Sequence, residues 1–91
     1  MYELRSTKAY RKSFKLVSRH KDFDSTTLEA VIDILQSDKI LPQKYRDHQL
    51  TGTLKEYREC HIKSDTLLVY QKRDDVLILL LVDIGSHSSL F

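Results

Sequence analysis

Several residue types on which common functional sites depend are scarce in this chain. Its 91 residues include one cysteine, two glycines, one proline and no tryptophan. A single cysteine cannot form an internal disulfide, which fits a reducing compartment. Two glycines are too few for a glycine-rich loop that cradles phosphate, and no serine has the flanking glycines of a nucleophile elbow. Disulfide scaffolds, P-loop nucleotide sites and serine hydrolases of the α/β type are therefore excluded.

Long apolar runs are also missing. The longest, from Val76 to Val82, is ended by Asp83 and is far shorter than the roughly 20 residues that span a bilayer. The basic N-terminus is not followed by an apolar segment, so no signal peptide is expected. We therefore predict a cytoplasmic protein that makes no membrane contact and folds as one domain over residues 1–91.

Charge is distributed unevenly along the chain, although the net charge is only +2. Residues 1–21 are strongly basic and contain a single acid, Glu3, whereas residues 22–39 are mainly acidic. A basic face of this kind can bind phosphate or an acidic protein. The alternative is an ordinary solvated helix surface.

Two amphipathic helices are predicted in the first half of the chain. The first is expected to begin at Ser6 or Thr7, which can cap it. The second is expected to begin at a capping box formed by Thr26 and Glu29. Because only a short polar segment joins the helices, they should form an antiparallel hairpin. Their apolar stripes follow helical spacing and consist of Tyr10, Phe14 and Val17, and of Leu28, Val31, Ile32 and Leu35.

A sheet is predicted from four strand-like segments. A short first strand over residues 2–5 precedes the helices, and runs over 54–62, 67–72 and 76–82 follow them, joined by hairpin-length turns. Residues 38–52 have neither helical nor strand periodicity and are expected to form a functional loop. The fold class is therefore α+β, with the helical hairpin packed on one face of a three- to four-stranded, mainly antiparallel twisted sheet. The other face, which carries His61, should be open.

Three histidines are candidates for chemistry, because none of them belongs to a helical apolar stripe. They are His48, His61 and His87. No histidine pair has the H-x-x-x-H spacing and no cysteine pair lies near, so we predict neither a metal site nor a cofactor. Imidazole titrates near neutrality and can act as acid or base without either. The alternative is that each histidine is incidental.

Cleavage of RNA is one reaction that such residues could catalyse. The ribose 2′-OH attacks the adjacent phosphate, so the protein needs only a base, an acid and cations for the developing charge. Asp65 could orient or stabilise one imidazole. Tyr57 and Phe91 could stack on an exposed base, although packing of the C-terminus is an equally good use for Phe91.

At these residues the sequence resembles the YafQ branch of the RelE/ParE toxin superfamily. The resemblance covers nearly the whole chain, and its blocks are specific in combination. They are Tyr45-Arg46-Asp47-His48-Gln49-Leu50 with Gly52, Tyr57-Arg58-Glu59-Cys60-His61-Ile62 with Asp65, Leu67-Leu68-Val69-Tyr70, and Gly85-Ser86-His87-Ser88-Ser89-Leu90-Phe91.

The resemblance implies a toxin of a type II toxin–antitoxin system that cleaves mRNA on the ribosome and is neutralised by a cognate antitoxin. It implies acid–base roles for His48, His61, Asp65 and His87, and a base-holding role for Phe91. The expected partners are the antitoxin, the ribosome and mRNA, with DNA reached only through the antitoxin complex.

The sequence departs from the family pattern at two positions. Asp83 stands where the family usually has an arginine that stabilises the scissile phosphate, and Thr66 stands where a tryptophan is common. Loss of one such stabiliser can cost about 10²–10³ in rate. We predict that Lys55 or Arg46 supplies the missing cation, and that Asp83 raises the pKa of His61 or His87.

Asp83 also keeps two alternatives open. One is a weakly active or inactive binding module that captures its antitoxin, can occupy ribosomes and contributes to repression of its operon. The other follows the relatives that inhibit DNA gyrase, and the full set of histidines argues against it.

Overall fold

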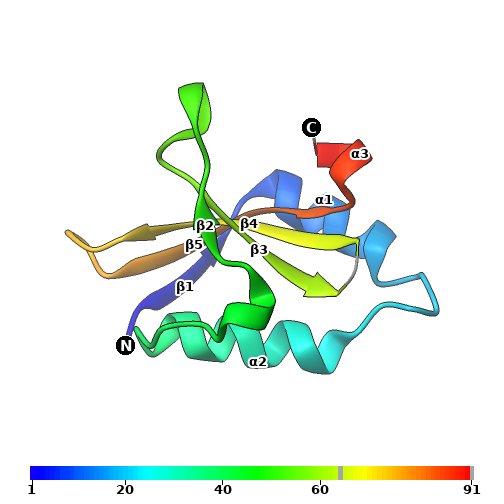
Figure 1. The fold of residues 1–91 in the computed structure, drawn as a ribbon, viewed down its shortest axis with the longest axis horizontal. Helices are drawn as coiled ribbons and strands as arrows, with labels where there is room; N and C mark the ends of the chain where they lie inside the picture. Colours follow the sequence, from blue (N-terminus) through cyan, green and yellow to red (C-terminus); the bar gives the residue numbers. More distant parts are fainter. Residues whose placement is uncertain (64, 91) are drawn as a thin grey trace.

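Three α-helices and five strands make up the fold in the computed structural model, which describes residues 1–63 and 65–90 (Figure 1). Throughout these residues, no helix is long and apolar enough to cross a membrane. The elements, with two short 3-10 turns, are β1 (Glu3–Ser6), α1 (Lys8–Val17), α2 (Ser25–Gln36), η1 (Gln43–Tyr45), β2 (His48–Gln49), η2 (Gly52–Leu54), β3 (Arg58–Lys63), β4 (Thr66–Arg73), β5 (Ile78–Gly85) and α3 (His87–Leu90).

The sheet has five strands in the order β1-β5-β4-β3-β2. β1 runs parallel to β5 and every other pair is antiparallel, which confirms the α+β class and the mainly antiparallel sheet. The prediction of three to four strands missed β2, because a strand of two residues has no periodicity to detect. The strand expected from Leu54 begins only at Arg58, since Leu54 belongs to η2.

Helices α1 and α2 run in roughly opposite directions, as predicted (Figure 1). The hydroxyl of Thr7 caps α1 by accepting the Tyr10 backbone N–H at 2.9 Å. The capping box at Thr26 was wrong. Asp24 caps α2, because its carboxylate accepts both the backbone N–H of Thr27, at 2.9 Å, and the Thr27 hydroxyl, at 2.6 Å. A carboxylate that accepts two bonds satisfies the helix start better than a hydroxyl.

The two helices and one face of the sheet share a single hydrophobic core. Side chains alternate along β3, so Cys60 and Ile62 point to the helices while Glu59 and His61 point away. Cys60 is fully buried, and burial raises the pKa of its thiol to about 12, as expected of core filler rather than a nucleophile. The buried core consists of Tyr2, Tyr10, Leu28, Val31, Leu35, Leu41, Cys60, Ile62, Leu68, Tyr70, Leu79, Leu81 and Ile84.

The opposite face of the sheet is more covered than the sequence suggested. Leu67 and Val69 lie on it and are 0% and 7% exposed. After β5, the chain turns back as α3 over the end of this face. A Cβ at Gly85 would lie 2.6 Å from Ser89 Oγ, so any side chain at this position would displace the Ser89 hydroxyl. The face that carries His61 is thus partly closed by the segment that carries His87.

Candidate active site

The strand register aligns the polar residues of the second face in two rows. In one row, His48 on β2 is opposite Glu59 on β3, Glu59 is opposite Val69 on β4, and Val69 is opposite Asp83 on β5. In the other row, His61 is opposite Leu67, which is opposite Gly85. Directly paired side chains of antiparallel strands lie on the same face. Residues that are distant in sequence are therefore gathered on one patch of sheet.

Glu59 lies at the centre of this patch, between two imidazoles. Its side chain is only 4% exposed, and Oε1 lies 3.5 Å from His48 Nε2 and 3.9 Å from His61 Nε2. A buried carboxylate is costly unless positive charge lies nearby. Both of these contacts come from imidazole nitrogens, which are groups that can carry and transfer a proton.

The loop before β2 holds His48 in place. Arg46 adopts a left-handed backbone conformation, with φ 50°, and its carbonyl oxygen lies 2.7 Å from His48 Nδ1. Asp47, between them, accepts hydrogen bonds from the hydroxyl of Tyr70 and from Arg58 Nε and Nη2, both at 3.3 Å. Tyr70 is fully buried in the core, so the loop that carries His48 is fastened to the rigid part of the sheet.

The pKa of His61 is lowered from its ordinary value. Burial is the largest cause, and the positive fields of Arg46, His87 and His48 add to it, while Glu59 opposes the shift. The predicted rise in the pKa of His61 is not found, and Asp83 is not among the causes of the shift. The carboxylate of Asp83 instead accepts the backbone N–H of Ile84 at 2.9 Å, and Glu59 is the acid that contacts His61.

His87 begins α3, next to His61. The centroids of the two rings are 6.2 Å apart, and His87 is exposed. Because α3 folds back over Gly85, the third imidazole arrives from the C-terminus of the chain beside the other two. The three histidines selected from the sequence therefore lie together.

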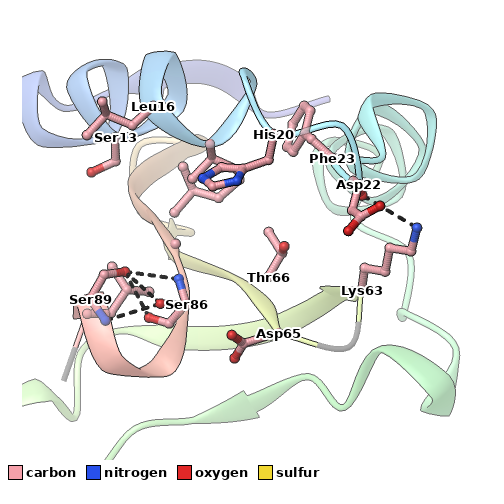
Figure 2. A pocket seen from close by; sticks show the side chains of 14 residues that line it. Ser13, Leu16, His20, Asp22, Phe23, Lys63, Asp65, Thr66, Ser86 and Ser89 are labelled. Atoms are coloured by element: carbon pink, nitrogen blue, oxygen red, sulfur yellow. Dashed lines mark hydrogen bonds between the residues drawn. The ribbon is translucent and has the colours of Figure 1, made fainter.

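The remaining predicted residues are dispersed. Asp65, on the turn between β3 and β4, is exposed and lines a cavity of about 800 Å³ together with His20 and Ser86 (Figure 2). Lys55 lines a different cavity, beside Arg58 and Tyr70, because its segment forms a turn rather than a strand. The expectation that Lys55 shares a strand face with His61 was therefore wrong.

Three further residues predicted for the site are Tyr57, Arg46 and Phe91. Tyr57 is half-buried just before β3, where its carbonyl accepts the Leu50 backbone N–H at 3.0 Å. Arg46 lines the same cavity as His61, so it is the better placed of the two predicted cations. Phe91 lies outside the described residues, and its base-holding role stays a prediction.

Glu59 is the residue that sequence reasoning left out of the site. The signal was available, because Glu59 and His61 are two positions apart on a strand and must share a face. Its contact with His48 could not be read from the sequence, since β2 was taken for loop. In the part of the chain that the structure describes, no three His, Cys, Asp or Glu side chains are grouped so as to hold a metal ion.

The fold is that of a small bacterial toxin. Residues 2–91 match the family described as bacterial toxin of type II toxin–antitoxin system, YafQ. The chain belongs to this family.

Several relatives are similar over most or all of the chain. An mRNA interferase toxin YafQ of Escherichia coli strain K12 is 36% identical over 84 residues, which cover 90% of this chain and 87% of the relative. A metal-bound toxin from Helicobacter pylori is 42% identical, with a TM-score of 0.91 and full coverage of both chains. A chain of the E. coli DinJ–YafQ complex is 27% identical, with a TM-score of 0.87, and the match covers 100% of this chain and 99% of that one.

Proposed function

We propose that the protein cleaves messenger RNA at the patch formed by His48, Glu59, His61 and His87. As a YafQ toxin of a type II toxin–antitoxin system, it is an mRNA interferase, an endoribonuclease. The observation that carries the catalytic proposal is the buried Glu59 carboxylate, which faces two imidazoles, with a third ring 6.2 Å from His61.

The reaction needs one neutral and one protonated imidazole. A lowered pKa keeps His61 neutral near pH 7, so it can accept the proton of the ribose 2′-OH. The 2′ oxygen attacks phosphorus, the P–O5′ bond breaks, and a protonated imidazole donates its proton to the departing 5′ oxygen. His87, exposed beside His61, is the proposed acid, and the products are a 2′,3′-cyclic phosphate and a 5′-OH.

His48 and Glu59 have supporting parts in this scheme. The Nδ1 contact with the Arg46 carbonyl makes Nδ1 the donor, so Nε2 faces Glu59. A proton on Nε2 would make His48 a cation held by Glu59, close to the negative charge that grows on the phosphate. Asp65 stays a proposed orienting residue, and Tyr57 and Phe91 stay proposed base-stacking residues.

The ribosome is the proposed site of action, and this places the protein in the cytoplasm. Helix α1 exposes basic side chains along its length, among them Arg11, Lys12 and Lys15, which can contact ribosomal RNA phosphates. A small sheet with a shallow catalytic patch gains substrate positioning from such a platform.

The proposed partner in the resting state is a cognate antitoxin, as in the DinJ–YafQ complex of the E. coli relative. An acidic or amphipathic segment laid across α1 and the histidine patch would neutralise the basic helix and mask the site. Contact with DNA would come only through this complex.

A purified-ribosome assay tests the function. Ribosomes programmed with a defined mRNA should yield discrete cleavage products with the wild-type protein. His87→Ala should reduce the rate about 10²–10⁴-fold, the usual contribution of a general acid. Intact mRNA with the wild-type protein would reject the nuclease proposal.

Asp83 supports a second candidate, a catalytically weak binding module. Asp83 lies in the same row as Glu59 and His48, so it adds negative charge to the face that receives the phosphate. A growth assay separates the two functions. Arrested growth on expression favours the nuclease, whereas normal growth with tight antitoxin binding favours the module.

A further inference from the structure

A basic cavity lies beside His61, at the edge of the sheet. β2 pairs only with Arg58 and Glu59, so the rest of β3 extends beyond it and η1 lies against β3. The cavity between them has a volume of about 500 Å³. It is lined by Thr27, Lys44, Tyr45, Arg46, His61, Ile62 and Lys63. Of these described residues, three are cations and none carries a carboxylate.

The three cations are held differently. At Arg46 the backbone is held in a left-handed conformation by its N–H bond to the Gln43 carbonyl at 3.0 Å and by the contact of its own carbonyl with His48. The ammonium of Lys44 lies 5.1 Å from the centroid of the Tyr45 ring. Lys63 Nζ donates to the Asp22 carbonyl at 3.4 Å, a long bond that an anion can replace.

We propose that this cavity binds a phosphate of the RNA chain next to the cleaved linkage. The inference rests on the proposed nuclease function and adds a substrate subsite to it. Asp83 stands where the family usually has an arginine. In this proposal Arg46, Lys44 and Lys63 supply the positive charge instead, at a different edge of the patch.

The chemistry of the lining selects phosphate. Two ammonium groups act as point charges and the guanidinium offers a planar fork of donors, a set that matches a phosphodiester. Lys44, Arg46 and Lys63 are exposed, so an incoming phosphate can reach them without unfolding the loop. Asp24 interacts electrostatically with Lys63, but its carboxylate is already engaged by Thr27 at the start of α2.

Binding can be measured apart from cleavage. An RNA oligonucleotide with a 2′-deoxy sugar at the cleaved position cannot undergo attack, and it can be titrated into the protein while the ring resonances of His61 are followed by NMR. Inorganic phosphate is titrated in parallel. The matched variants are Lys44→Gln/Lys63→Gln and the control Lys39→Gln, which changes an exposed lysine outside this cavity.

The double variant should bind the oligonucleotide at least tenfold more weakly than wild type. The slope of log binding constant against log salt should fall by about 0.7, the value for one single-strand phosphate contact. Lys39→Gln should keep both values. Equal binding and slope in the double variant and the control would overturn the subsite, as would a His61 response to inorganic phosphate with none to RNA.

Failure of the subsite and failure of the nuclease give different results. A protein that binds the oligonucleotide through these cations but never cleaves mRNA keeps the subsite and loses the nuclease. A protein that cleaves mRNA equally well with and without Lys44 and Lys63 keeps the nuclease and loses the subsite.

Discussion

The two faces of strand β3 differ in what they do. Cys60 and Ile62 lie in the core against the helices, at 0% and 5% exposure. Glu59 and His61 alternate with these residues and lie on the opposite face, together with His48 and His87. Because side chains alternate along a strand, the six residues of β3 supply core side chains on one face and candidate site side chains on the other. Changes on the two faces should therefore have separable effects.

The largest difference between effects on stability and effects on cleavage is expected for the pair Leu68→Ala and His61→Ala. Leu68 is fully buried in the core, so its truncation should reduce the free energy of unfolding by about 2–5 kcal/mol. His61→Ala should reduce mRNA cleavage about 10²–10⁴-fold with a much smaller change in stability. Urea unfolding and the ribosome assay measure the two effects. Loss of stability in His61→Ala as large as in Leu68→Ala would remove the distinction between the faces.

Charge on the histidine face should set the pH dependence of cleavage. A base must be unprotonated, so the rate should fall as pH drops through the pKa of His61, which lies below its ordinary 6.5. Glu59 raises that pKa and Arg46 lowers it. Glu59→Gln should therefore move the acidic limb of the pH–rate profile to lower pH, and Arg46→Gln should move it to higher pH. Movement of both in the same direction would show that His61 is not the base.

Two tyrosine–aspartate hydrogen bonds offer a matched pair on different parts of the molecule. Tyr70 donates to Asp47, which adjoins His48, and Tyr2 donates to Asp74, at the β4–β5 turn. Either Tyr→Phe change should reduce the free energy of unfolding, because it removes a hydrogen bond to a charged group. Only Tyr70→Phe should also shift the His48 resonances in NMR and slow cleavage. Equal cleavage in the two variants would mean that Asp47 does not position His48.

The smallest effect is expected from Gly85→Ala. The added Cβ meets Ser89 Oγ, which bonds both the backbone N–H and the carbonyl of Ser86 at 3.0 Å. Displacing that hydroxyl should loosen α3 and His87, and slow cleavage several-fold. In the double variant Gly85→Ala/Ser89→Ala the clash is gone, but the hydrogen bonds between Ser89 and Ser86 are still lost. Cleavage should match that of Ser89→Ala alone. A double variant slower than both single variants would point to a clash elsewhere.

The parts of the fold that follow periodic patterns could be predicted from the sequence. Helices α1 and α2, the meander of β3, β4 and β5, and the burial of Cys60 are local consequences of side-chain spacing. The three histidines could be selected because no apolar stripe includes them.

Parts that depend on tertiary contacts could not be predicted. Asp47 is bonded to Arg58 and Tyr70, which lie 11 and 23 positions further along the chain. These bonds fix a loop whose sequence shows no helical or strand periodicity. The pairing of the two-residue β2 brings His48 to Glu59, which was therefore overlooked. Lys55 was misplaced because a strand was extended through a 3-10 turn, where side chains no longer alternate.

The chemistry of the cut ends tests the central claim most directly. Attack by the 2′-OH with proton transfer between imidazoles must leave a 2′,3′-cyclic phosphate and a 5′-OH. Messenger RNA cut on ribosomes by the wild-type protein should carry these ends, and His61→Ala should produce few of them. Ends with a 3′-OH and a 5′-phosphate would require attack by water instead, and would contradict the assignment of the histidine patch.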